Sequence, residues 1–378
     1  MNKKIKIILG LIILVLIVWG IYSISQKSQE PISNEPIKIG VITILSGNLA
    51  FLGENIVKSA ELAVEDLQKD GVEIQLIIED VGGLAGQGVE AVSALQKLVQ
   101  IDNIRYIIDG MTSDGTMAVA PLVDEYKVVM ITPLTGGENI DNAAEYLFRN
   151  GPSDIIAGTK PAEQLYNKFG YKKVAVLTDN AEYTLDIVKH FIKNYEGDVV
   201  VDETITPDNN DYRTELAKVK GSDAEAIFVN TATGVSAQYI IKQAGELGID
   251  IPIFANFIAY GPDLIKVAGS YAENVYIYDP ELNEESRDVK SFIERYNEKN
   301  GFEPPIKFHS TGTYDAVSMG VEAIKAVGND GKKIHDYLLE NIKNWKGFNG
   351  KVTFDEKGNS GCGFVLKQVK NGELVLVK

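Results

Sequence analysis

Hydroxyl-bearing side chains follow two neighbouring apolar stretches of the sequence. Thr112, Ser113 and Thr116 come after the apolar run 104–108, and the polar loop 132–137 follows the apolar run 128–131. Two short strand patterns with a helical pattern between them predict a βαβ unit, whose strands are parallel neighbours. Because open α/β sheets bind ligands at the carboxyl ends of their strands, we expect both loops at one ligand site.

The chemistry that these loops offer is anion binding. A helix that begins near residue 113 has free backbone N–H groups in its first turn, and the nearby hydroxyls add further donors. The alternative is a plain N-cap, in which Ser113 or Asp114 only caps the helix. One such loop alone favours the cap, whereas two loops side by side favour a small-ligand site.

Length, composition and charge describe an ordinary globular protein. The chain has 378 residues, of which 45% are hydrophobic and 24% charged, so two domains with real cores are expected. The formal net charge of −16 argues against nucleic acid, whose phosphates an acidic surface repels.

Neither catalysis nor metal binding is predicted from the sequence. Cys362 is the single cysteine, and the three histidines, His190, His309 and His335, are scattered. No metal-binding Cys/His spacing, phosphate loop or nucleophile–base pair is present in the sequence. We therefore expect no enzyme activity, no cofactor and no metal.

The N-terminus carries a targeting signal. Lys3, Lys4 and Lys6 precede an uncharged apolar run, 7–26, close to the roughly 20 residues that span a bilayer core. Basic residues before the run predict that the N-terminus stays inside and the rest of the chain outside. Residues 1–26 are thus predicted to be a single transmembrane anchor, and 27–36 a polar linker. A signal peptide cleaved after Ser25 is the alternative.

The remaining chain alternates strand and helix patterns in two series, roughly 37–137 and 153–280. This alternation predicts an α/β fold with parallel strands. Three helical patterns follow within 284–343, and the last strand patterns, within 363–377, are joined by a hairpin signal at Asn371-Gly372. Since such late elements can complete two earlier sheets, the chain is expected to cross between lobes more than once.

Short segments spread over the folded chain carry a family resemblance. They are Ile39-Gly40-Val41, Leu45-Ser46-Gly47, Gly53, Glu79-Asp80, Asp109-Gly110, residues 112–116, residues 129–133, Phe148-Arg149, Asp179 with Tyr183, and residues 354–359. In order and spacing the chain resembles the type I periplasmic binding proteins, specifically the branched-chain amino-acid class of ABC-transporter solute receptors.

The resemblance implies two Rossmann-like lobes that close on a ligand by a hinge motion. Three crossings are implied, near Gly151, Pro280 and Gly347. The implied lobe bounds are 37–152 with 281–346, and 153–280 with 347–378.

The resemblance also implies a function. It is that of an extracytoplasmic receptor that captures a small amino acid or related carboxylate for ABC permease and ATPase subunits. The folded domain would lie outside the cell membrane, in an extracellular or periplasmic space. A ligand-sensing domain of a signalling system, built on the same fold, is the alternative.

Binding residues carry over from the resemblance one position at a time. Ser113 takes the place of the hydroxyl that holds the ligand's carboxylate in the family. In the second loop Thr135 keeps a hydroxyl, and Gly136 offers a bare N–H. Tyr183 matches an aromatic of lobe 2, and Leu52 stands in a loop that often brings an aromatic to the cleft.

The main departure from the family lies at Asn256 and Phe257, where amino-acid-binding relatives usually place a carboxylate against the ligand's ammonium. A buried ammonium without an ion pair is costly. The ligand is therefore expected either to lack an α-amino group or to find its partner charge at Asp114 or Asp179. Phe257 would close over an apolar tail, or else be a core aromatic, and Ala232 completes the predicted set.

Overall fold

The computed structural model describes residues 36–83, 87–261 and 263–377. The chain divides into two units, Met1–Pro36 and Ile37–Lys378, and all elements below belong to the second. The predicted anchor, 1–26, and the linker up to residue 35 lie outside the described residues. Within the described ranges, no helix is long and apolar enough to cross a bilayer.

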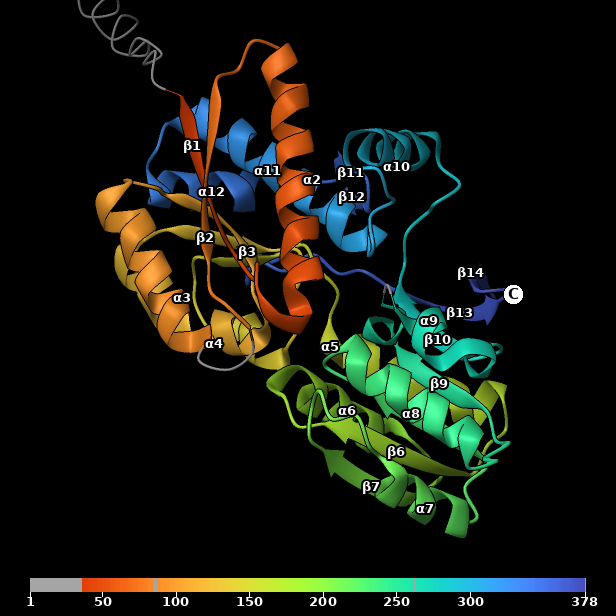
Figure 1. The fold of residues 1–378 in the computed structure, drawn as a ribbon. Coiled ribbons are helices and arrows are strands. Elements are labelled where there is room, and N and C mark those ends of the chain that lie inside the picture. Colours follow the sequence, from red (N-terminus) through yellow and green to blue (C-terminus); the bar gives the residue numbers. More distant parts are fainter. Residues whose placement is uncertain (1–35, 84–86, 262, 378) are drawn as a thin grey trace, which may run out of the picture. The chain divides into compact units, whose positions relative to one another are not determined.

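The first sheet has five parallel strands in the order β2-β1-β3-β4-β5. They are β1 (Ile37–Thr43), β2 (Ile74–Asp80), β3 (Tyr106–Gly110), β4 (Val129–Thr132) and β5 (Leu147–Arg149). The connecting helices are α2 (Ala50–Lys69), α3 (Gln87–Gln96) and α4 (Ser113–Tyr126). Figure 1 shows α2 on one side of this sheet and α3 and α4 on the other. Cover on both faces explains why these strands are continuous apolar runs.

The second sheet repeats this order and adds two antiparallel strands, giving β14-β13-β10-β9-β8-β6-β7. Its strands are β6 (Lys173–Asp179), β7 (Asp198–Ile205), β8 (Ala226–Asn230), β9 (Ile253–Asn256), β10 (Tyr276–Pro280), β13 (Phe364–Lys370) and β14 (Glu373–Leu376). Its helices are α5 (Asp154–Glu163), α6 (Glu182–Asn194), α7 (Arg213–Gly221), α8 (Gly234–Glu246) and α9 (Leu264–Ala268). The predicted α/β class is therefore confirmed.

The predicted hairpin between the last two strands is also confirmed. Asn371 and Gly372 have φ angles of 53° and 82°, the left-handed geometry that a two-residue hairpin turn requires. Strand β13 in turn pairs antiparallel with β10.

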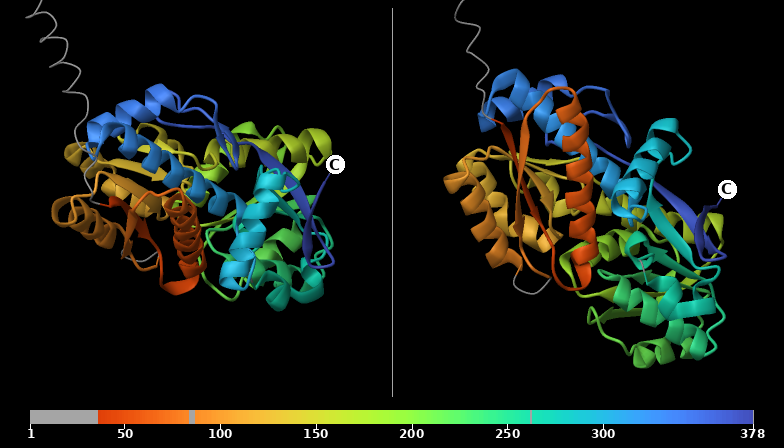
Figure 2. Two further views of the ribbon diagram at one scale, coloured as in Figure 1. Left: turned by 90° about the horizontal axis from the view of Figure 1, so that it is seen from above. Right: turned by 45° about the horizontal axis from the view of Figure 1, so that its top comes forward.

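Three late helices return to the first sheet: α10 (Arg287–Asn300), α11 (Lys307–Val327) and α12 (Gly331–Asn341). The hydroxyl of Tyr106 in β3 donates to the carbonyl of Ala316 in α11, 2.7 Å away. Figure 2 shows the blue helices α11 and α12 beside the strands of the first sheet, whereas α10 packs on α2 and α11.

The last crossing of the chain lies after Phe354. The small sheet of β11 (Trp345–Gly347) and β12 (Gly350–Val352) stays with the late helices, because the N–H of Phe348 donates to the carboxylate of Asp315 in α11. The chain then passes β5, where Arg149 pairs with the crossing segment at Asn359. The structure thus places this crossing beyond the predicted position near Gly347.

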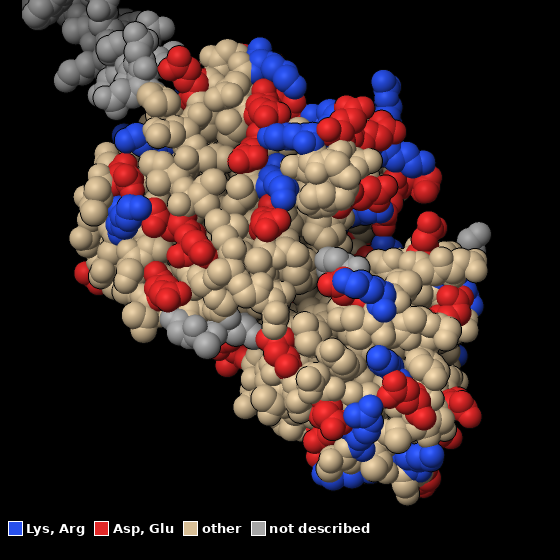
Figure 3. Space-filling view, in the orientation of Figure 1, with Lys and Arg blue, Asp and Glu red and all other residues tan. Residues whose placement is uncertain are grey.

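Charged side chains of both signs are scattered over the face of the described residues that Figure 3 shows. On the face in Figure 3, Lys and Arg side chains alternate with Asp and Glu side chains. Lys367, 12% exposed, contacts Asp279 and Glu284, both at 2.6 Å, near the second crossing. Acidic and basic side chains are therefore mixed on this face rather than separated into patches of one sign.

Candidate ligand-binding site

Loops at the carboxyl ends of six strands meet at one cavity. Both sheets have the strand order in which ligands bind where the order reverses, at β1/β3 and at β6/β8. The lining residues follow β1, β3, β4, β6, β8 and β9; they are Leu49, Leu52, Thr112, Ser113, Asp114, Leu134, Thr135, Ala181, Tyr183, Ala232, Phe257 and Ile258. The cavity is therefore shared between the two sheets.

The first sheet contributes a free hydroxyl at a helix start. Thr112 is the N-cap residue of α4, but its side chain makes no capping bond and donates instead to Gln87. Ser113, the first helical residue, is 2% exposed, and its Oγ has no hydrogen-bond partner. The plain-cap alternative for Ser113 is thus excluded, and its hydroxyl lies beside uncapped N–H groups at the positive end of the helix.

The second loop is already hydrogen-bonded within itself. Thr135 Oγ1 lies 2.8 Å from Thr132 Oγ1, and the Thr135 N–H donates to the same Thr132 oxygen. Beneath both loops is the buried carboxyl of Asp109, which accepts from Thr116 and from the Met111 N–H. Burial raises the pKa of Asp109 to about 7. These bonds fix the loops from below and leave the Ser113 hydroxyl available.

The second sheet contributes aromatic rings. The Tyr183 and Phe257 ring centroids are 6.2 Å apart, and His309 of α11, a helix that packs on the first sheet, stands edge-on to Phe257 at 5.2 Å. Burial raises the pKa of the Tyr183 hydroxyl well above its usual value, so this side chain is neutral. This half of the cavity suits an apolar or aromatic ligand group.

Asn256 does not line the cavity. Its side-chain N–H groups donate to the Thr231 carbonyl at 2.8 Å and to Asn230 Oδ1 at 3.1 Å. Asp179 also lies outside the lining, since its Oδ2 accepts from the Ala232 N–H and holds that loop. Asp114 is the one carboxylate among the described lining residues, and burial raises its pKa.

The cavity is small, about 40 Å³. A volume of this order holds water rather than an amino acid. Phe257 also lines a second, wider hollow of about 900 Å³ near α2, α11 and β14. An organic ligand therefore requires the two sheets to separate or Phe257 to move.

Seven of the eight residues predicted for the site are brought together at the cavity: Leu52, Ser113, Asp114, Thr135, Tyr183, Ala232 and Phe257. Gly136 is not among the lining residues; its carbonyl accepts from the Arg149 guanidinium at 2.7 Å. Four apolar lining residues were not predicted: Leu49, Leu134, Ala181 and Ile258. In the sequence, these four residues are distinguished only by lying in the same loops as the predicted site residues.

The chain belongs to the periplasmic binding protein family, whose model matches residues 36–373. The Leu/Ile/Val-binding protein of Escherichia coli K12 is 25% identical over 333 residues, covering 86% of this chain and 88% of the relative. The Leu/Ile/Val-binding protein homolog 3 of Brucella melitensis is 23% identical, and the match covers 90% of this chain and 93% of the relative.

Solved structures of solute-binding proteins are similar to this fold. The branched-chain amino acid transporter substrate binding protein LivJ of Streptococcus pneumoniae, in complex with isoleucine, superposes with a TM-score of 0.82 at 29% identity, covering 90% of this chain and 98% of LivJ. The leucine binding protein LivK of Thermotoga maritima superposes with a TM-score of 0.82 at 25% identity, and the match covers 90% of this chain and 98% of LivK. The predicted family and its type I fold are thus confirmed.

Proposed function

We propose that this chain is the extracytoplasmic solute receptor of an ABC importer and captures a small amino acid or related carboxylate. One observation carries the ligand class: the Ser113 hydroxyl is buried without a partner at the start of α4, inside a cavity that both sheets line. A carboxylate oxygen would satisfy this hydroxyl and the N–H groups of the first turn.

The lining favours a carboxylate held by neutral donors. No lysine, arginine or histidine is present among the described lining residues, so backbone N–H groups and hydroxyls must bind the negative charge. Asp114 is available to pair with an ammonium group, and Asn256 is engaged elsewhere. Binding of an amino acid therefore depends on Asp114, whereas binding of a plain carboxylic acid does not.

Closure of two lobes is the mechanism. Ser113 and Thr135 come from loops of the first sheet, and Tyr183 and Phe257 come from loops of the second. A ligand that contacts both sets stabilises the closed arrangement. The chain would act by binding and release, without chemical turnover, and pass the ligand to permease and ATPase subunits.

Residues 1–26 would anchor the receptor in the membrane. Lys3, Lys4 and Lys6 beside the uncharged run 7–26 support an uncleaved span. The full-length protein should then remain in membranes after a high-salt wash, and its N-terminal peptide should be found by mass spectrometry. A mature N-terminus at Gln26 would show a cleaved signal peptide instead.

A thermal-shift screen of the full-length protein tests the binding role. Amino acids, aliphatic carboxylates and aromatic carboxylates should be compared, because a ligand that binds only the folded form raises the melting temperature. Asp114→Asn should abolish the shift for amino acids and keep it for plain carboxylates. Asp250→Asn is the matched control, because Asp250 is exposed and does not line the cavity. No shift with any carboxylate would refute the proposal.

A further inference from the structure

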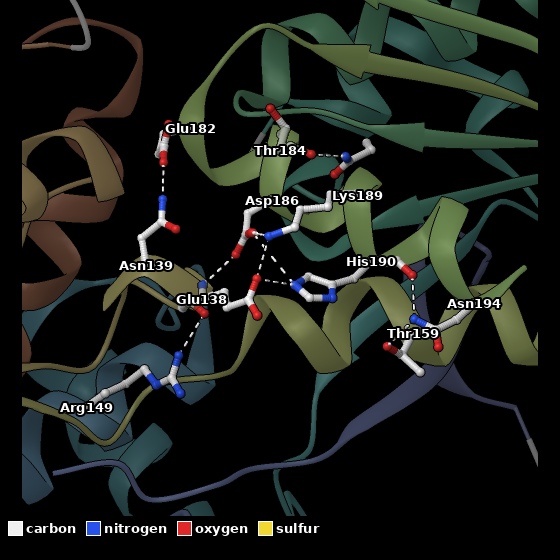
Figure 4. A network of polar contacts seen from close by, with 12 residues as sticks. Glu138, Asn139, Arg149, Thr159, Glu182, Thr184, Asp186, Lys189, His190 and Asn194 are labelled. Carbon is white, nitrogen blue, oxygen red and sulfur yellow. Dashed lines mark hydrogen bonds and ion pairs between the residues drawn. The ribbon is translucent and has the colours of Figure 1, made fainter. Parts of the chain in front are cut away.

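Three potential metal ligands from different parts of the fold meet next to the ligand cavity but outside its lining. Glu138 starts the short 3-10 helix η3 (Glu138–Asn142) of the first sheet's side, and Asp186 and His190 lie on α6 beside the second sheet. Their ligand atoms lie within 4.8 Å of one another. Figure 4 shows the three side chains pointing toward a common centre.

Two of the three distances between these ligand atoms, the two from His190, are close to those of a tetrahedral site. His190 Nε2 is 3.3 Å from Glu138 Oε2 and 3.7 Å from Asp186 Oδ1. Zinc bonds of about 2.0–2.2 Å to nitrogen and oxygen place neighbouring ligand atoms of a tetrahedron about 3.3–3.6 Å apart. Asp186 and His190 are four residues apart, so they project from the same face of α6.

His190 supplies a second, independent sign of a missing ligand. Its side chain is only 5% exposed, and Nε2 lies at ion-pair distance from the two carboxylates but makes no hydrogen bond of good geometry to any described residue. A buried polar nitrogen without a partner is costly. A metal ion at the common centre would satisfy it.

The charges around the cluster are unbalanced. Three carboxylates, those of Glu138, Asp141 and Asp186, lie near two permanent cations, Arg149 and Lys189, while burial and the nearby Asp186 raise the pKa of Asp154 well above its usual value and favour its neutral form. The buried Asp154 Oδ2 also has no hydrogen-bond partner. The remaining excess of negative charge beside the partly exposed Glu138 favours a divalent cation.

Lys189 is the competitor for this place. Its ammonium contacts Glu138 and lies 3.7 Å from Asp186 Oδ1. The side chain is 58% exposed, so its ammonium can turn to solvent when a metal ion enters. The lysine thus marks the position at which a positive charge is stabilised.

We propose that Glu138, Asp186 and His190 bind one divalent transition-metal ion, with zinc the best fit to two carboxylates and one imidazole. A fourth position would remain for water. Because η3 and α6 belong to the sides of different sheets, the ion would hold the two lobes together beside the loops that line the ligand cavity.

Calorimetric titration of the metal-stripped full-length protein with zinc chloride tests the proposal without any organic ligand. One zinc ion should bind per chain. Glu138→Gln and His190→Asn should each weaken binding by more than the 10- to 100-fold that loss of an outer-shell partner costs. Lys189→Met should tighten binding several-fold, since it removes the competing ammonium and no ligand.

Several outcomes would overturn the site. Absence of zinc binding, binding that survives Glu138→Gln, or weaker binding in Lys189→Met would show that the cluster is only an ion-pair contact. His335→Asn is the matched control, because His335 also lies beside a carboxylate, 3.0 Å from Asp336. If His190→Asn does not fold, Glu138→Gln decides, since the Glu138 side chain is 42% exposed.

Discussion

Substitution of Ser113 by alanine removes one oxygen from the proposed carboxylate site. A hydrogen bond to a charged group contributes about 1.5–3 kcal/mol, and 1.4 kcal/mol corresponds to about tenfold in affinity. Ser113→Ala should therefore weaken ligand binding by about 10- to 100-fold. The unliganded fold loses no hydrogen bond, because Ser113 Oγ has no partner and is buried.

Stability should move in the opposite direction to affinity. A buried hydroxyl without a partner costs about 1–3 kcal/mol of folding free energy. The melting temperature of the unliganded Ser113→Ala protein should accordingly stay the same or rise. This pairing of weaker binding with an unharmed fold separates a binding role from a structural one.

Calorimetry with the ligand from the thermal-shift screen measures the affinity, and thermal melts without ligand measure the stability. Ser318→Ala is the matched control, because the Ser318 hydroxyl donates to the Tyr314 carbonyl within α11 and lies outside the cavity. Unchanged affinity in Ser113→Ala, or a loss of affinity that follows a loss of stability, would refute the assignment.

Three further predictions concern the hinge, pH and packing. Small-angle scattering should show a smaller radius of gyration at saturating ligand, and an equal radius would contradict closure. Burial raises the Asp109 pKa from 3.8 to about 7. Between these values the folded state holds a proton that the unfolded state has lost, so the free energy of unfolding falls as pH rises. Asp109→Asn should reduce that fall, measured by thermal melts from about pH 4 to 7. An unchanged dependence of stability on pH would show that Asp109 does not cause it. Gly53→Ala should lower stability by about 1–3 kcal/mol, because its Cβ would stand 1.7 Å from the Ile44 carbonyl oxygen; a wild-type melting temperature would show that α2 shifts freely.

Much of the fold was predictable because local pattern and burial agree. Strand β1 is a run of β-branched residues that the structure covers on both sides, and Asn371-Gly372 has the one backbone geometry that its hairpin needs. The place of the last crossing was not predictable. It depends on the contact between Phe348 and Asp315, which no spacing in the sequence indicates.

The site was predictable in its polar part. Hydroxyls after apolar runs, such as Ser113 and Thr135, mark strand ends directly, whereas Leu134 and Ile258 look like any apolar loop residue. Which of these faces the cavity is decided by the packing of one sheet's loops on the other's. The cluster of Glu138 and His190 was hidden for a similar reason, because its members come from segments that only the fold brings together.

The order of the two sheets' elements along the sequence also limits the order in which they can fold. All five strands of the first sheet are made before residue 150, yet the helix that covers β3, α11, begins only at Lys307. The second sheet likewise waits for β13 to pair with β10. Contacts so distant in sequence slow folding. Neither sheet can gain all of its packing and pairing partners on a nascent chain that stops short of these segments.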